Sequence, residues 1–82
     1  MTKGEFLKTM KTWNVASRYY SISEEKKENA VNLEKISDDL YCVYYLERGE
    51  KIEMKSFTKI EDAYDEVARV IKSWIDLGSD VS

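Results

Sequence analysis

The stretch from Leu40 to Gly78 constrains the fold more than any other part of the chain. Residues 40–46 are rich in β-branched and aromatic side chains, which favour a pleated strand. A short polar segment, Glu47–Glu50, follows and contains Gly49, and glycine readily takes the positive φ that tight hairpin turns require. Residues 51–57 return with alternating apolar and charged side chains, so the sequence predicts a β-hairpin.

The two faces of the first strand are both largely apolar, because successive side chains of a strand point to opposite sides. One face would carry Tyr41, Val43 and Tyr45, and the other Leu40, Cys42, Tyr44 and Leu46. This pattern indicates a central strand buried on both faces; the alternative is a tyrosine-bearing contact surface on one of them. In the second strand, the alternation predicts a half-buried arrangement, with Ile52 and Met54 inward and Lys51, Glu53 and Lys55 outward.

A long amphipathic helix is predicted directly after this hairpin. Thr58 and Glu61 have the spacing of a capping box, with Thr58 as N-cap, and Gly78 is a natural stop. The apolar side chains recur at helical spacing and form one stripe: Ile60, Ala63, Tyr64, Val67, Ile71, Trp74 and Ile75.

The N-terminal part of the chain is predicted to begin with a helix over Thr2–Trp13. Thr2 and Glu5 form a second capping-box pattern, and Asn14 is a plausible stop. Residues 18–22 indicate a short strand, and the polar residues 23–29 indicate a solvated connection.

A further strand is predicted over residues 30–36, before a turn at Ser37–Asp39. Val31 and Leu33 would point inward, and Asn32 and Glu34 outward. The whole chain, 1–82, is therefore expected to be one α+β domain of order α-β-β-β-β-α. Its sheet would be a four-stranded antiparallel meander with both helices on one face and the other face partly wet.

Few side chains suited to catalysis are present. The 82 residues include no histidine and one cysteine, Cys42, which lies in the middle of the central strand and is expected to be a buried packing residue. No metal-ligand spacing, phosphate loop or nucleotide-binding fingerprint occurs, so neither an enzyme nor a cofactor is expected. The single cysteine, together with the lack of a long apolar run or an apolar leader, predicts a cytoplasmic protein that does not bind membranes.

Charge is unevenly distributed along the chain. Residues 1–20 hold four basic and one acidic side chain, whereas residues 21–82 hold nine basic and fifteen acidic ones. An acidic surface repels nucleic acid and attracts basic proteins. A double-stranded RNA-binding domain has a similar element order, but it needs lysines at the start of its last helix, where this chain has four acids. Nucleic-acid binding is therefore not expected.

The chain resembles a family of small bacterial immunity proteins from polymorphic-toxin and contact-dependent growth inhibition systems. The residues that carry this resemblance are Phe6, Tyr20-Ser21-Ile22, Tyr41-Cys42-Val43-Tyr44-Tyr45-Leu46-Glu47-Arg48-Gly49, Phe57 and Glu61-Asp62-Ala63-Tyr64. The chain departs from the family pattern in having Tyr41 where tryptophan is expected, and its last helix is longer. The resemblance implies a cytoplasmic inhibitor that binds a cognate toxin, typically a nuclease, at equal stoichiometry and covers its active site.

Charge and exposure patterns predict the contact surface of such an inhibitor. It would combine an exposed tyrosine, the hairpin turn and the polar side of the last helix: Tyr44, Glu47, Arg48, Glu50, Glu61, Asp62, Asp65 and Glu66. Its partner would be the basic, nuclease-like C-terminal domain of a toxin. Two other functions fit the same features, namely a phage-type acidic inhibitor of a host nucleic-acid-binding protein and a scaffold that forms a homodimer through its open sheet face.

Overall fold

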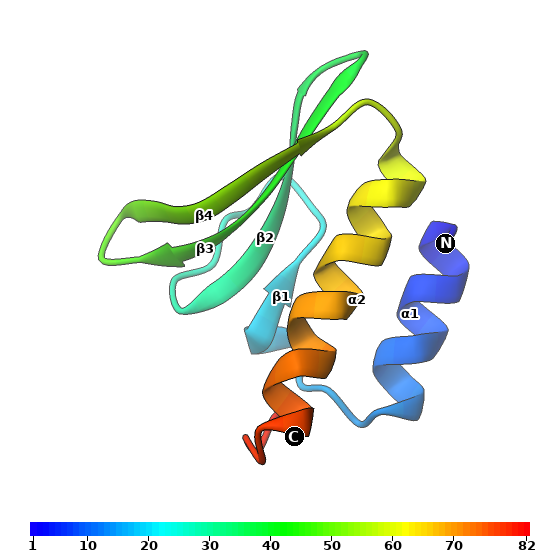
Figure 1. Ribbon diagram of the computed structural model, residues 1–82, viewed down its shortest axis with the longest axis vertical. Helices are drawn as coiled ribbons and strands as arrows, with labels where there is room; N and C mark the ends of the chain where they lie inside the picture. Colours follow the sequence, from blue (N-terminus) through cyan, green and yellow to red (C-terminus); the bar gives the residue numbers. More distant parts are fainter.

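Two helices lie side by side on one side of a four-stranded sheet (Figure 1). The computed structural model describes residues 1–82. The elements in chain order are α1 (Lys3–Thr12), a 3₁₀ turn η1 (Ser17–Tyr19), β1 (Tyr20–Ser21), β2 (Ala30–Ser37), β3 (Leu40–Glu47), β4 (Glu50–Phe57) and α2 (Ile60–Asp76). The prediction of an α+β fold with four strands and two helices is confirmed. Neither helix combines the length and apolar character needed to cross a bilayer.

The prediction of a purely antiparallel meander is wrong at the first strand. The strand order is β1-β2-β3-β4, but β1 runs parallel to β2, with Tyr20 opposite Val31. Parallel neighbours need a connection that carries the chain back to the starting end of the sheet. Residues 22–29 make that return, so they are not a hairpin turn. The strand is also shorter than predicted, because Ser17–Tyr19 forms the 3₁₀ turn.

The helix ends agree with the sequence prediction at three of four positions. At the start of α1, Thr2 and Glu5 exchange capping hydrogen bonds of 2.8 and 3.2 Å. Asn14 and Gly78 both have positive φ, 56° and 87°, and end α1 and α2. The predicted capping box at Thr58 is wrong. The helix begins one residue later, with Lys59 as N-cap and no side-chain cap, so Thr58 precedes the cap.

The main core lies between the sheet and the two helices. Phe6 of α1 joins the layers, since its ring lies 5.3 Å from that of Tyr20 and 5.6 Å from that of Tyr64. The apolar stripe of α2 packs here as predicted, although Ile60 at its start is exposed. Ten buried residues make up this main core: Phe6, Met10, Val31, Leu33, Val43, Ala63, Tyr64, Val67, Ala68 and Ile71.

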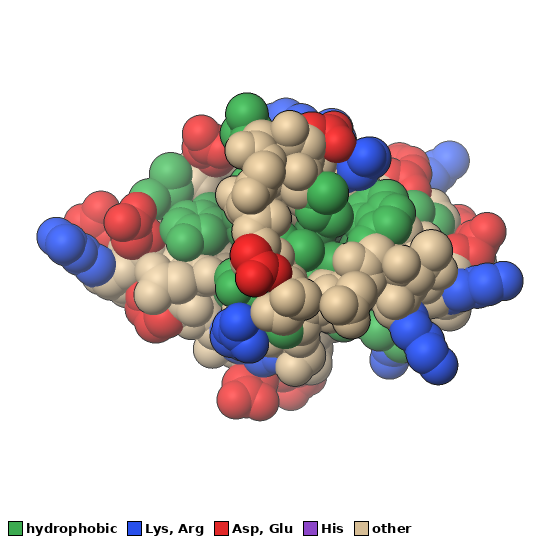
Figure 2. Space-filling model, turned by 90° about the horizontal axis from the view of Figure 1, so that it is seen from below, with side chains coloured by type: hydrophobic (Ala, Val, Ile, Leu, Met, Phe, Trp, Pro, Cys, Tyr) green, Lys and Arg blue, Asp and Glu red, His purple; other side chains and the backbone are tan.

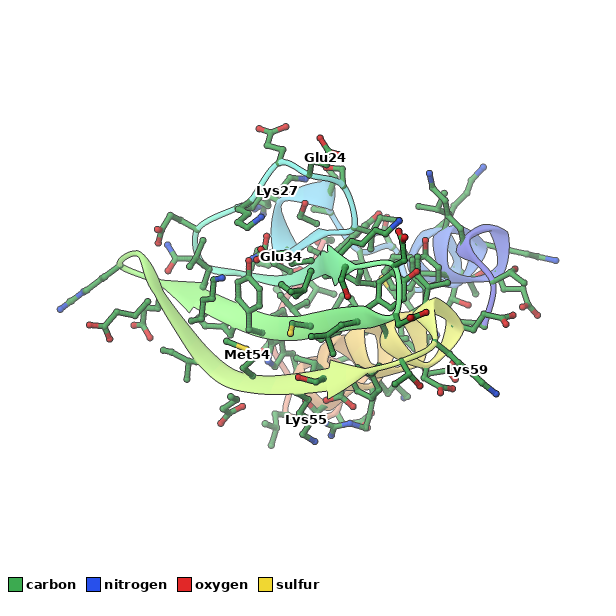
Figure 3. All side chains as sticks on the ribbon, turned by 90° about the horizontal axis from the view of Figure 1, so that it is seen from above. Glu24, Lys27, Glu34, Met54, Lys55 and Lys59 are labelled. Carbon is green, nitrogen blue, oxygen red and sulfur yellow. The ribbon has the colours of Figure 1, made fainter.

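Residues 22–29 cover part of the outer face of the sheet, around Asn32, and the rest of that face stays partly exposed, as predicted. Asn32, predicted to point to solvent, lies on this face but is only 1% exposed. Its side-chain amide bonds to the backbone N–H and C=O of Lys27, at 2.9 and 3.0 Å, and so fixes the loop over the sheet (Figure 3). Cys42, Tyr44 and Leu46 form a second buried cluster here, which confirms a central strand buried on both faces.

A β-bulge interrupts the alternation of β4. Tyr45 pairs with Ile52, but Val43 pairs with Lys55, so one extra residue lies between the two pairs. Directly paired residues share a face, which puts Ile52 and Lys55 on the helix side and Met54 on the outer side. Figure 3 shows Met54 and Lys55 projecting to opposite sides of β4. The prediction that Ile52 and Met54 share a buried face is therefore wrong, and Met54 is 51% exposed.

Candidate functional site

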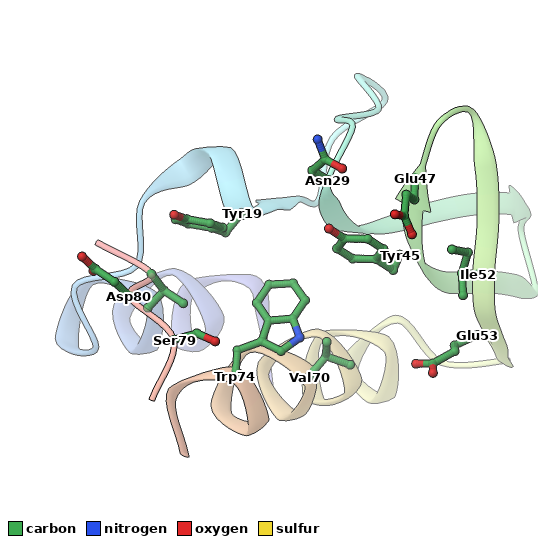
Figure 4. A pocket seen from close by; sticks show the side chains of 11 residues that line it. Tyr19, Asn29, Tyr45, Glu47, Ile52, Glu53, Val70, Trp74, Ser79 and Asp80 are labelled. Atoms are coloured by element: carbon green, nitrogen blue, oxygen red, sulfur yellow. The ribbon is translucent and has the colours of Figure 1, made fainter. Parts of the chain in front are cut away.

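A groove lies between the β3–β4 hairpin and the C-terminal half of α2 (Figure 4). Its volume is about 430 Å³. The hairpin, α2, η1 and the C-terminal segment all contribute to it. Its lining residues are Tyr19, Asn29, Tyr45, Glu47, Ile52, Glu53, Val70, Trp74, Ser79, Asp80 and Val81.

Aromatic rings form the middle of this groove. Tyr45 of β3 and Trp74 of α2 meet edge to face, with ring centroids 5.9 Å apart and planes at 89°. Both side chains are half-buried. Tyr19 forms one end of the groove, and the guanidinium of Arg18 lies 4.7 Å from the centre of its ring. Large apolar surfaces that stay partly exposed in this way are typical anchors for a partner.

The groove exists because the hairpin bends away from α2 at the bulge. Glu53 has a φ of 55°, a left-handed conformation that is uncommon for residues other than glycine. A bulge of this kind bends its strand and increases the local twist. The tip of the hairpin therefore stands clear of the helix, as Figure 1 shows, and the space between them is the groove.

A second cavity of about 320 Å³ continues the groove along α2. The two cavities share three lining residues, Tyr45, Glu53 and Val70. At the far end of the second cavity Glu66 binds the guanidinium of Arg69 at 2.9 and 2.6 Å, and Lys55 at 3.5 Å. These contacts lower the pKa of Glu66, with the Arg69 hydrogen bonds as the main cause.

The rim of the first cavity is acidic. Glu47 and Glu53 have no basic group within 4.0 Å. Asp80 accepts hydrogen bonds from the backbone and hydroxyl of Ser82, at 3.0 and 2.6 Å, which lower its pKa. Seen from below, hydrophobic side chains reach the surface between acidic and basic side chains (Figure 2). The arrangement suits a positively charged ligand that has a flat or apolar surface.

Tyr44, predicted to be an exposed anchor, is buried and 1% exposed. Its hydroxyl donates a 2.7 Å hydrogen bond to Glu34, and the ammonium of Lys51 lies 4.9 Å above its ring. Burial, and then this hydrogen bond, raise the pKa of Tyr44. The expectation of an exposed Tyr44 is wrong, because the side chain is buried in the cluster with Cys42 and Leu46, with Glu34 and Lys51 against it.

The other predicted contact residues do not form one surface. Glu47, Arg48 and Glu50 are exposed at the hairpin turn, whereas Glu61, Asp62 and Asp65 lie in the first turns of α2, beyond the opposite end of β4 (Figure 1). At about 3.3 Å per residue, the length of β4 separates the two groups by some 20 Å. Glu61 and Asp62 are exposed, Asp65 binds the N-terminal ammonium at 2.6 Å, and the Glu66 side chain is 11% exposed.

The structure adds groove residues that the sequence analysis did not select. Tyr45 and Trp74 were placed in the strand and helix patterns as core positions, and their edge-to-face contact joins segments far apart in the chain. If Tyr44 and Tyr45 are treated as equally good contact residues, the sequence also selects Tyr45. Glu53 carried no signal, because nothing in its neighbourhood predicts a bulge.

No group of three or more cysteine, aspartate or glutamate side chains is placed to hold a metal ion. Comparisons with protein-family models, with curated proteins and with solved structures found no match to this chain.

Proposed function

We propose that this protein is an immunity protein that neutralises a basic toxin, in the manner of an inhibitor that binds at equal stoichiometry. The observation that carries the proposal is the aromatic groove, whose rim carboxylates Glu47 and Glu53 form no ion pair within 4.0 Å. Toxins that cleave nucleic acid need basic surfaces to hold phosphate, and an acidic groove is complementary to such a surface. The resemblance to bacterial immunity proteins supports the same function.

The proposed inhibitor acts by covering the active site of the toxin. Carboxylates at the hairpin tip and groove rim speed the encounter with a basic partner, since long-range attraction raises association rates. The rings of Tyr45 and Trp74 then slow release, because buried aromatic anchors carry a large share of binding energy. We place this action in the cytoplasm, where the free thiol of Cys42 would stay reduced.

A binding and rescue experiment tests this function. The full chain is immobilised and a bacterial lysate passed over it. Any retained protein is then purified and assayed alone for nuclease activity. We expect one basic protein whose activity falls to zero at a 1:1 ratio of inhibitor, as the proposed stoichiometry requires. Variant Trp74→Ala should need a large excess to inhibit.

Two results would overturn the proposal. One is a retained protein whose activity is unchanged by saturating inhibitor. The other is self-association alone, measured by analytical ultracentrifugation. If the retained protein is a host nucleic-acid-binding protein without toxic activity, the partner class changes to that of a phage-type inhibitor.

A further inference from the structure

The middle of the groove combines aromatic rings with two carboxylates that form no ion pair. Tyr45 and Trp74 provide the rings, and Glu47 and Glu53 stand on the hairpin side (Figure 4). A planar cation is favourable over such rings, and charge-assisted hydrogen bonds to carboxylates are roughly twice as strong as neutral ones.

Three basic side chains around the groove bind other groups. Arg69 is held by both oxygens of Glu66, and Lys55 binds the same carboxylate. Arg18 lies over Tyr19 and donates to the carbonyl oxygen of Ser82 at 3.0 Å. Glu47 and Glu53 form no ion pair within 4.0 Å, although the charge of Arg69 interacts with Glu53 at longer range and Arg48 follows Glu47 in the chain.

At the end of the groove, Arg18 already places a guanidinium against an aromatic ring. Its guanidinium rests 4.7 Å from the centre of the Tyr19 ring, beside the carboxylate of Asp80, whose pKa it helps to lower. Guanidinium is planar, more weakly hydrated than ammonium and able to bind carboxylates through two donors. These properties match a groove with two rings and two carboxylates better than those of lysine.

We propose that the groove between β3–β4 and α2 binds an arginine side chain of the partner protein, with its guanidinium against Tyr45 and Trp74 and its charge met by Glu47 and Glu53. The proposal rests on the proposed function, since it names how the basic partner is recognised. It also gives the left-handed conformation of Glu53 a role, because strained backbone persists where function requires it.

A small arginine probe tests this site on the full chain. N-acetyl-arginine methylamide is titrated into ¹⁵N-labelled protein, with the citrulline analogue, which has nearly the same shape but no charge, as the matched ligand. We expect saturable shifts of the Trp74 indole N–H and of the amides of Glu47 and Glu53 with the arginine compound only. Equal shifts with citrulline, or shifts confined to other residues, would overturn the proposal.

Variants at Glu53 separate binding from folding. Glu53→Gln keeps the size of the side chain and should weaken arginine binding about tenfold, the value of a charged hydrogen bond. Glu53→Gly should weaken it equally while the Tm stays the same or rises, since glycine adopts a φ of 55° without strain. The control Glu24→Gln removes one exposed charge outside the groove and should leave the affinity unchanged. Equal weakening by Glu24→Gln would show general charge attraction and no arginine site.

The two proposals fail separately. If the neutralised toxin binds Glu53→Gln as tightly as the unaltered protein, the arginine site is wrong and the inhibitor function stands. If the arginine compound binds with the predicted dependence on Glu53 but no toxin is inhibited, the site stands and the function is wrong.

Discussion

Tyr44 and Tyr45 are neighbours in β3 and have opposite environments. The side chain of Tyr44 points to the outer face, where it is buried with Cys42 and Leu46 and its hydroxyl donates a 2.7 Å hydrogen bond to Glu34. That of Tyr45 points to the helix face, where it is half-buried and meets Trp74 at the edge of a groove. The sequence suggests that the helix side is the sealed core and the outer side the contact surface. The structure reverses this at the hairpin end of the sheet.

The difference shows what closes a sheet face in a chain this small. No helix covers the outer face. There the Asn32 side chain pairs with the backbone N–H and C=O of Lys27 in the loop, and Glu34 accepts a hydrogen bond from the Tyr44 hydroxyl. On the other face α2 covers the sheet only as far as the bulge at Glu53 allows. Hydrogen bonds of Asn32 and Glu34 therefore help to bury polar groups on the outer face, whereas the bulge at Glu53 leaves a groove on the helix face.

Alanine at each tyrosine gives the largest expected contrast. Tyr44→Ala should lower the free energy of unfolding by about 3–4 kcal/mol, because it empties a fully buried site. Tyr45→Ala should cost less, about 1–2 kcal/mol, because its side chain is only partly buried. Urea denaturation of the two variants measures both values. Equal losses would show that the two faces are sealed equally well.

Asn32→Ala tests the seal of the outer face directly. The substitution leaves the backbone N–H and C=O of Lys27 without their partners, and we expect a loss of about 2 kcal/mol. Hydrogen exchange should become faster at residues 22–29 while the amides of α2 keep their protection relative to global unfolding. Unchanged exchange in the loop would mean that other contacts hold it.

Glu34→Gln tests the charged part of the same seal. The hydrogen bond from Tyr44 is the main cause of the lowered pKa of Glu34, so its carboxylate stabilises the fold above the ordinary value of 4.5, and that stability is lost as the pH falls through the folded value. At pH 7 the variant should be about 1 kcal/mol less stable. The difference should shrink at pH 3. Glu50→Gln, at an exposed turn position, is the control.

Arg48→Asn should have the smallest effect on the free energy of unfolding. Arg48 lies in the hairpin turn, at the groove end of the sheet. Arg48 and Gly49 have φ values of 52° and 77°, the pair of left-handed residues that a two-residue hairpin turn requires. Asparagine tolerates this conformation better, so we expect a gain of about 0.5 kcal/mol in unfolding free energy. The arginine affinity of the groove should not change, as Arg48 does not line it. A weaker affinity would assign the turn a part in binding.

Local patterns predicted most of the fold. The period of α2, the capping box at Thr2 and the glycines at turn and helix end each specify a geometry through their immediate neighbours. The direction of β1 was not predictable in this way. The parallel pairing of β1 accompanies a return of residues 22–29 in which the Asn32 side chain binds the backbone of Lys27, a contact that no spacing rule describes.

The candidate site was harder to predict from the sequence for a related reason. Glu47 was selected, but Tyr45, Trp74 and Glu53 come together only through the tertiary arrangement of β3, β4 and α2. The alternation rule gave the correct faces of β3 and failed in β4, because a bulge shifts every later residue to the other face. Of the acids selected from charge alone, Glu47 and Glu50 lie at one end of that strand, Glu61, Asp62 and Asp65 lie beyond the other end, and Glu66 binds Lys55 between them.

The bulge at Glu53 also bears on how the protein behaves at high concentration. β4 is an edge strand, and an uninterrupted edge is a template on which further strands can add until the protein aggregates. The extra residue breaks the regular row of donors and acceptors near the middle of β4, and the other edge, β1, offers only Tyr20 and Ser21. Removal of the extra residue would straighten the edge, and fibrils or strand-exchanged dimers should then form at concentrations where the natural chain stays dispersed.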